Sequence, residues 1–399
     1  MKILILTRLF CYILLFLLSF SAIAGIQLSD EDSDVKVTIS GRLQAMAIMN
    51  DNDYKPDEGI NFRVRRARLR AALEFNSELS MVFQGELSNG GSFNGETDLI
   101  DAYIKYKPDS WLQVIAGLNM APAQRQNLTS AGSMLALDRP GITNYNLTWG
   151  MKGNTALQTG TVPGTKITSF GRHQVRDKGI TLFGTGQLND NNYLKYYLSI
   201  NEGSRFADDT NRYTARFQWN IGDQESGYYN LSSYLGKKET TGFAIALDRQ
   251  ESFATNAITA APVDYHLITV DAFIEKPWAE GYLNLEAAYV NLDLDDVMNP
   301  LADFNNDPLS TTPANRTQGE GFYVQAGYLV GKWQPWILLE QWHTDAPESN
   351  GSWQSVRLGA TYHLFDQKAS VKVGLESTRV EGTNAMDILT AALGLYMSF

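Results

Sequence analysis

The feature that most constrains this chain is an alternation of apolar and polar side chains with a period of two residues. From Val35 to Met49 every second residue is apolar or glycine, and the intervening residues from Lys36 to Gln44 are polar. Because successive side chains of a β-strand point to opposite faces, this run predicts a strand with one apolar and one polar face. The pattern returns later in the chain, at residues 79–83, 100–106, 194–200, 213–219, 283–289, 356–362 and 371–375.

Residues 1–24 have the parts of a secretory signal peptide. Lys2 and Arg8 precede an apolar run from Leu9 to Phe20, and a small-x-small triplet ends just before Gly25. The apolar run is too short to span a bilayer comfortably as a helix. We therefore expect residues 1–24 to be cleaved after export.

After this segment no apolar stretch is long enough for a membrane helix, although the chain holds 19 Tyr, 18 Phe and 8 Trp, widely dispersed. A transmembrane barrel needs such a distribution, because one strand face contacts lipid and the other contacts water. We therefore predict that residues 25–399 form one domain, an all-β, antiparallel transmembrane β-barrel. Its expected location is the outer membrane of a Gram-negative bacterium.

Short turns alternate with long polar segments, as is typical of bacterial barrels. Residues 107–109 and 365–367 are short turns, whereas residues 202–210 and 293–318 are long segments. The chain has about seventeen strand-like runs, but single-chain bacterial barrels have an even number. Treating residues 228–236 as an ordered periplasmic turn leaves sixteen strands. Eighteen would follow if residues 142–152 formed an extra hairpin.

The last run alternates up to Met397 and ends on Phe399. A terminal aromatic residue behind alternating apolar residues resembles the signal that barrel-assembly machinery recognises. With the N-terminus in the periplasm, an even strand number returns Phe399 to the periplasmic side, beside the first strand. The expected partners are therefore outer-membrane lipid, including lipopolysaccharide, and the assembly machinery.

Charge and cysteine content exclude other classes of function. Without Lys2 and Arg8 the formal charge is −13, with 31 basic against 44 acidic residues, which argues against a nucleic-acid partner. Cys11 lies in the signal segment, so the exported chain has neither disulfides nor thiolate metal sites. The four histidines are far apart, and no nucleophile elbow or phosphate loop is present. We expect no cofactor, no metal and no enzymatic activity.

The highest density of charged residues lies between Phe62 and Leu69, and Arg70 follows directly. The alternation of side chains between the two faces of a strand, here called parity, places three of these side chains in the lumen. They are Arg66, Arg68 and Arg70. Arg63 and Arg65 fall on the lipid parity, where arginine costs roughly 2–4 kcal/mol at mid-bilayer, so they must lie above the hydrocarbon or be turned by a bulge. A lumenal arginine row binds and relays anions. The alternative is a row balanced by lumenal acids, Glu74, Glu86 and Asp101.

Parity also assigns the run at residues 100–106. Ile100, Ala102 and Ile104 take the lipid face, which leaves Asp101, Tyr103 and Lys105 inside. The longest segment without a predicted strand follows, from Leu118 to about Lys178. A segment of this length is usually functional, and the alternative is a solvated external loop.

Four motifs in this order and spacing resemble the phosphate-selective porin O and P family. They are the arginine-rich stretch 62–69, the sequence Asp-Ala-Tyr-Ile at 101–104, Leu-Thr-Ser at 128–130 and Asp-Arg at 138–139. The resemblance covers roughly residues 35–200. It implies a sixteen-stranded homotrimeric porin whose inward-folded third loop, residues 119–150, narrows the pore. It also implies a constriction lined by Arg65, Arg66, Asp101 and Arg139.

One departure concerns phosphate. Members of the family that bind phosphate place a lysine beside the Thr-Ser pair, whereas this sequence has Ala131-Gly132-Ser133 and no lysine until Lys152. A site with fewer cations binds phosphate less tightly. The residues predicted to line the constriction or bind anions are Arg65, Arg66, Arg68, Arg70, Asp101, Tyr103, Lys105, Ser130, Ser133 and Arg139.

The expected function is a water-filled channel for passive diffusion of small hydrophilic solutes, with a preference for anions such as phosphate. Two alternatives stay open. One is a general, non-selective porin, and the other is a barrel with a structural or surface-recognition role. A barrel hydrolase, whose Ser and His would meet only in space, is a third reading.

Overall fold

The structure is a computed structural model, and it describes residues 25–29, 35–52, 59–87, 97–143, 157–158, 176–203, 210–256, 261–295, 318–344, 352–381 and 385–399. The predicted signal peptide and almost all of the alternative hairpin at 142–152 lie outside these residues. In the described part of the chain no helix is long and apolar enough to cross a membrane.

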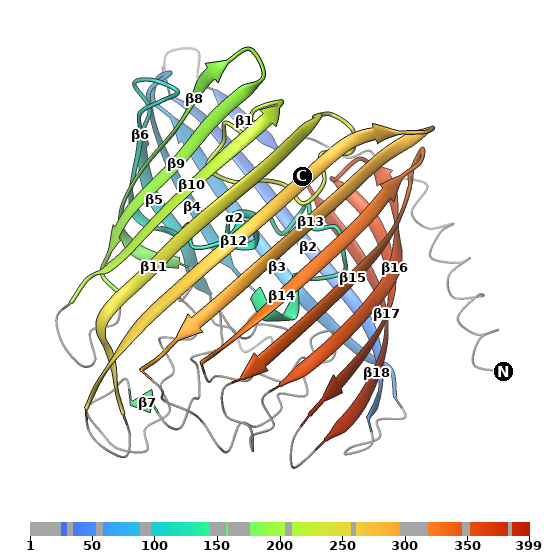
Figure 1. Ribbon diagram of the computed structural model, residues 1–399. Helices are drawn as coiled ribbons and strands as arrows, with labels where there is room; N and C mark the ends of the chain where they lie inside the picture. Colours follow the sequence, from blue (N-terminus) through green and yellow to red (C-terminus); the bar gives the residue numbers. More distant parts are fainter. Residues whose placement is uncertain are drawn as a thin grey trace.

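Within the described residues, sixteen antiparallel strands form a closed barrel, as predicted (Figure 1). Each pairs with its neighbours in chain order, β6 pairs with β8, and β18 pairs with β2 to close the ring. The strands of the barrel are β2 (Lys36–Asn52), β3 (Asn61–Glu74), β4 (Leu79–Glu86), β5 (Asp98–Tyr106), β6 (Gln113–Met120), β8 (Arg176–Asn189), β9 (Asn192–Asn201), β10 (Arg212–Gly222), β11 (Thr240–Asn256), β12 (Pro262–Trp278), β13 (Gly281–Asp293), β14 (Gly319–Leu329), β15 (Trp333–Thr344), β16 (Trp353–Phe365), β17 (Ala369–Val380) and β18 (Met386–Ser398).

Three short elements are not strands of this ring. β1 (Ile26–Ser29) pairs with the start of β2, and β7 (Leu157–Gln158) pairs with the end of β11. The helix α2 (Arg125–Leu128) is a single turn between β6 and β8. The run at 228–236 is not a strand, in agreement with its prediction as a turn, and it lies in the connection between β10 and β11.

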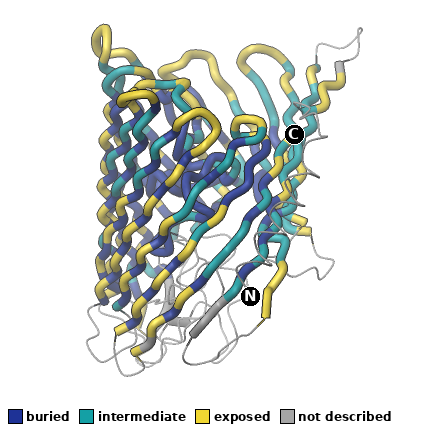
Figure 2. Tube along the Cα trace, turned by 90° about the vertical axis from the view of Figure 1, so that its right-hand side faces the viewer, coloured by how far each residue is buried: buried dark blue, intermediate teal, exposed yellow. Residues whose placement is uncertain are grey.

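Burial alternates along the strands as the period-two pattern predicts (Figure 2). β15 alternates without interruption, with Ile337 and Leu339 exposed and Leu338 and Glu340 buried. The exposed row is apolar, while the buried row holds many charged and amide side chains. The pleat of each strand therefore separates a lipid-facing apolar surface from a polar interior.

One assignment of a side chain to a strand face, made from the alternation pattern, is wrong. Ile100, assigned to the lipid face, is 8% exposed, and Leu99 is exposed instead. Between β4 and β5 the pairing shifts so that Asp101 and Leu99 oppose successive residues of β4. This bulge inserts Ile100 as an extra residue and reverses the parity at the start of β5.

Short and long connections lie at opposite ends of the barrel. Residues 75–78, 190–191, 279–280 and 366–368 are short turns at the end where β2 starts and β18 stops. The C-terminus closes the barrel there, since Phe399 N and O exchange hydrogen bonds of 3.0 and 3.1 Å with the backbone of Gly41. Most turns at this end are tight, but residues 223–239 make a longer connection.

Candidate functional site

The segment between β6 and β8 packs against the buried rows of the strands. Residues 121–143 are almost entirely buried. Lys372 of β17 donates hydrogen bonds to the carbonyls of Leu135 and Ala136 at 3.2 and 3.0 Å. Gly141 N donates to Glu340 Oε2 of β15 at 2.6 Å. The backbone of this segment is thus held by charged side chains that face away from the lipid surface.

Apolar contacts reinforce this attachment. Residues 134–137 pack in one cluster with Met46 and Ile48 of β2, Trp336 of β15 and Tyr396 of β18. The strand opposite Leu135 has a glycine, Gly327, where an added Cβ would lie 2.5 Å from the leucine side chain. Close approach of the segment to the wall therefore depends on a small residue in β14.

A second segment reaches this site from the other end of the barrel. In the turn 223–239, Asn230 N donates to Leu128 O at 2.8 Å and Ser130 N donates to Asn230 O at 3.2 Å. Thr129 and Asn230 thereby form a parallel β-bridge. Gln126 Nε2 also donates to Ser232 Oγ at 3.1 Å. The two connections, more than 80 residues apart in sequence, are joined through their backbones.

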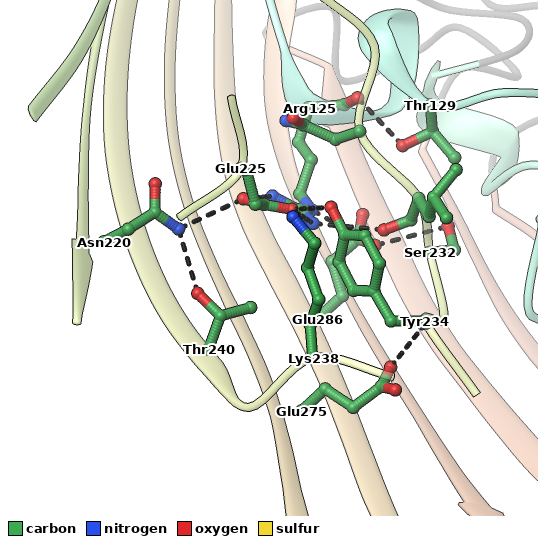
Figure 3. Close-up of polar contacts among 12 residues, drawn as sticks. Arg125, Thr129, Asn220, Glu225, Ser232, Tyr234, Lys238, Thr240, Glu275 and Glu286 are labelled. Atoms are coloured by element: carbon green, nitrogen blue, oxygen red, sulfur yellow. Dashed lines mark hydrogen bonds and ion pairs between the residues drawn. The ribbon is translucent and has the colours of Figure 1, made fainter. Parts of the chain in front are cut away.

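A buried ion pair links the same two segments (Figure 3). Arg125 Nη1 and Nη2 donate to Glu225 Oε2 and Oε1 at 3.0 and 2.7 Å, and the guanidinium carbon lies 3.8 Å from the ring centre of Phe273. Glu225 accepts further hydrogen bonds from Gln218 at 2.6 Å and from the Tyr234 hydroxyl. Burial opposes the charge of Glu225, but Arg125 holds the pKa of this carboxyl far below its ordinary value.

A β-bulge in β3 determines the direction of Arg65. Arg66 and Val64 pair with successive residues of β2, so Arg65 is an extra residue. Arg65 therefore points to the same side as Arg66. Arg65 Nε lies 2.6 Å from Asp138 Oδ2, and Arg66 Nη2 lies 2.9 Å from Asp138 Oδ1. The local bulge required to reconcile Arg65 with the strand pattern is present.

Next to these ion pairs lies a cavity of about 360 Å³. The strands β2 and β3, the segment 121–143 and the start of β8 contribute five arginines to its lining, which are Arg42, Arg68, Arg70, Arg139 and Arg176. Asp101 is the one acidic residue among the described residues that line it. The cavity is therefore strongly basic, although the whole chain is acidic.

Only part of this positive charge is neutralised. Arg68 pairs with Glu86 at 2.6 Å, and Arg176 pairs with Asp101 at 3.0 Å. The other three arginines, Arg42, Arg70 and Arg139, make no ion pair with any carboxylate that the structure describes. Guanidinium groups remain protonated in proteins, so the cavity has an excess of positive charge.

Arg139 is held by the inner segment itself. Its Nε and Nη2 donate to the carbonyls of Gln126 and Thr129 at 3.0 and 2.7 Å. Burial, and then repulsion from Arg66, lowers the pKa of Arg139 well below its ordinary value. An anion in the cavity would relieve this repulsion.

Six of the ten predicted site residues line the cavity: Arg68, Arg70, Asp101, Tyr103, Ser130 and Arg139. The other four are not among its lining residues. Arg65 and Arg66 are bound to Asp138, Lys105 Nζ is 5.3 Å from the ring centre of Phe183, and Ser133 Oγ donates to Ser130 O at 3.1 Å.

Other residues of the site were absent from the predicted set. Arg42 lies on the polar parity of the first long strand, opposite Arg68 in the β2–β3 pairing, so the alternation pattern could have identified it. Asp138 was recognised as part of a motif but was not assigned a role. Arg176 and Tyr229 line the cavity only because distant segments meet there, and no local signal marks them.

The described residues contain no cluster of three or more His, Cys, Asp or Glu side chains that could hold a metal ion.

A family model described as "Phosphate-selective porin O and P" matches residues 37–393. A search of curated proteins finds no match.

Solved porins share the fold at low sequence identity. An anion-selective porin from Comamonas acidovorans is 13% identical with a TM-score of 0.60, over 92% of this chain and 100% of that chain. OmpF of Salmonella typhi, in complex with daunomycin, is 13% identical with a TM-score of 0.56, over 94% and 100%. In vitro folded OmpT of Vibrio cholerae, in its trimer form, is 8% identical with a TM-score of 0.52, over 92% and 100%.

Proposed function

We propose that this outer-membrane porin, which belongs to the phosphate-selective porin O and P family, conducts small anions in preference to cations. The observation that carries the proposal is the cavity with five arginines, three of which have no carboxylate partner among the described residues. Fixed positive charge in a narrow, weakly solvated passage attracts anions and repels cations. Inorganic phosphate and other small hydrophilic anions are the solutes in this reading.

In this proposal residues 121–143 fold into the lumen and form the constriction, together with part of the predicted loop 119–150. Support comes from the contacts of this segment with β2 and β3 on one side and with β15, β17 and β18 on the other. The anion would pass along Arg42, Arg68 and Arg70, with Arg139 facing it from the segment. Arg65 and Arg66 would act indirectly, by holding Asp138.

The assembly and export of the channel belong to the same proposal. We expect removal of residues 1–24, recognition of Phe399 by barrel-assembly machinery and contact with outer-membrane lipid, including lipopolysaccharide. We also propose a homotrimer, which is supported by the likeness to OmpT of Vibrio cholerae in its trimer form. Passive diffusion requires neither a cofactor nor a catalytic residue.

Reversal potentials in a salt gradient across a planar bilayer test the selectivity. We expect anion preference in the unmodified protein and a lower chloride-to-potassium permeability ratio in Arg42→Ala, Arg70→Ala and Arg139→Ala. Each charge should change the permeability of each ion by up to about fivefold, in opposite directions for chloride and potassium, because one unit charge at about 4 Å is worth about 1 kcal/mol in water. Addition of phosphate should reduce the chloride current.

Lys237→Ala is a matched control, because Lys237 forms an exposed ion pair with Asp366 at the end of the barrel. Its permeability ratio should equal that of the unmodified protein. A preference for cations would overturn the proposal, and a ratio near one would favour a general porin. No stable open level would instead favour a barrel with a structural or recognition role.

A further inference from the structure

The lining of the basic cavity also contains apolar and aromatic side chains, and the attraction of anions does not explain their presence. Beside the arginines of β2 and β3, the lining contains Val82 of β4, Tyr103 of β5, Met120 of β6 and Tyr229 of the turn 223–239. Three of these residues are core members of one buried hydrophobic cluster, and Tyr229 packs against it. The cavity is therefore amphiphilic, because its lining combines guanidinium groups with apolar and aromatic side chains.

The aromatic part of this lining is rigid. Tyr229 packs edge-on against Tyr228, with ring centres 5.2 Å apart, and Tyr228 packs edge-on against Phe183 and Tyr197 at 5.0 and 5.4 Å. The next residue, Asn230, forms the backbone bridge to Thr129. Tyr229 is thus held in position before any solute arrives, so a bound solute would lose little free energy in ordering it.

An inorganic oxyanion would interact favourably with the guanidinium groups only. Its charge gains nothing from apolar surface, and desolvation beside such surface is unfavourable. The cavity of about 360 Å³ has room for roughly twelve water molecules at about 30 Å³ each. It also falls within the range of small-molecule pockets, about 300–1,000 Å³. A solute with a ring or an apolar body beside its charge would interact favourably with both kinds of side chain.

We propose that the cavity favours small organic anions in which a carboxylate or phosphate is attached to an aromatic or apolar body. The anionic group would contact Arg42 and Arg70, whereas the body would lie against Tyr103 and Tyr229. This inference rests on the proposed anion channel and specifies its class of solute. Aromatic contacts of this kind correspond to about two- to tenfold in affinity.

Blocking of the chloride current by added anions tests the inference in the unmodified protein. Acetate, benzoate, cyclohexanecarboxylate and inorganic phosphate are added in turn at constant ionic strength, and the half-blocking concentration of each is measured. We expect benzoate to block at about two- to tenfold lower concentration than acetate. Equal half-blocking concentrations for acetate, benzoate and cyclohexanecarboxylate would overturn the inference.

Variants at Tyr229 locate the effect. Tyr229→Phe keeps the ring and should keep the ratio of acetate to benzoate half-blocking concentrations, while Tyr229→Ala should bring the ratio close to one. Arg70→Ala should weaken both blockers and leave the ratio unchanged, because it removes charge but no apolar part of the lining. A ratio unaffected by Tyr229→Ala would contradict the role of this residue.

The two proposals fail in different ways. If the unmodified channel does not prefer anions, the proposed function fails. If it prefers anions but the half-blocking concentrations do not depend on the apolar body, only the solute class fails. The comparison in the unmodified protein remains decisive even if Tyr229→Ala does not fold.

Discussion

A single inserted residue decides the environment of Arg65. In a regular strand this side chain would face lipid, and the bulge instead directs it to Asp138, which also binds Arg66. One carboxylate thereby pairs with two guanidinium groups that would be costly in isolation, and the three groups keep one net positive charge. Four of the five arginines of β3 consequently divide into two groups, with Arg65 and Arg66 bound to Asp138 and Arg68 and Arg70 lining the cavity.

The acid dependence of the channel should follow from Asp138. Burial would raise its pKa, but Arg65 and Arg66 bring it well below the ordinary range. A carboxyl with a depressed folded-state pKa contributes stability above the unfolded pKa of about 3.9, and this stability is lost as the pH falls through the folded value. We expect the difference in thermal stability between the unmodified protein and Asp138→Asn to stay constant from pH 7 to about pH 4 and to decrease only at lower pH. A transition at pH 5–6 would contradict this assignment.

Substitution of the same carboxyl should be strongly destabilising. Asp138→Asn removes the carboxylate that binds Arg65 and Arg66, and removing one partner of a buried ion pair costs about 3–5 kcal/mol. Thermal unfolding followed by heat-modifiable migration in gels measures the loss. Asp387→Asn is the matched control, because Asp387 pairs with Arg379 on the exposed surface and such pairs contribute about 0–1 kcal/mol. Similar destabilisation in both variants would refute the role of Asp138.

At the scale of elements, the site arises from two connections that begin at opposite ends of the barrel and contact each other. The segment 121–143 is attached to the wall by Lys372, and the turn 223–239 holds it from the other side through Asn230 and Glu225. Neither connection forms a continuous hydrogen-bonded element by itself. Their mutual contacts satisfy polar groups that burial would otherwise leave unpaired.

Loss of the link between these connections should widen the channel. Arg125→Met removes the hydrogen bonds to Glu225 and leaves that carboxylate buried without its cation, so the two connections should separate. We expect higher single-channel conductance and weaker anion preference, since Arg139 belongs to the released segment. Lys237→Ala, in the same turn but exposed, should change neither quantity. An unchanged conductance in Arg125→Met would show that this link does not limit the opening.

For the whole molecule, the decisive contact is closure of the ring at the C-terminus. Phe399 is hydrogen-bonded to Gly41 through its backbone, and its ring lies over the same glycine, where an added Cβ would be 2.3 Å from Phe399 Cε1. Closure pairs β18 with β2 and leaves neither strand as an open edge. The ring of Phe399 thus covers the position where the two ends of the sheet meet.

Folding of the barrel should be sensitive to this contact. Phe399→Ala should reduce the fraction of folded, heat-modifiable protein in the outer membrane several-fold, because it removes the ring that covers the closure and the expected assembly signal. Met397→Leu preserves an apolar side chain on the neighbouring outward position and should fold normally. Equal yields for both variants would argue against a special role of Phe399.

Much of this architecture could be predicted from local patterns. The period of two identified the strands and their outward faces, and the even number required of a bacterial barrel separated the turn at 228–236 from the sixteen strands. Arg68, Arg70, Asp101 and Tyr103 were assigned to the interior by parity alone. Parity did not predict the two bulges, at Arg65 and Ile100, because an inserted residue reverses the alternation without changing composition.

The sequence by itself therefore determined the barrel, a strand number of sixteen or eighteen and which strand faces are apolar, because pleating couples each side chain to its neighbours two residues away. Only the tertiary structure decided which arginines keep an uncompensated charge and that Tyr229 lines the same cavity. Those relations require ring closure to bring the segment 121–143 against the turn 223–239, and contacts between residues so far apart leave no periodic trace in the chain.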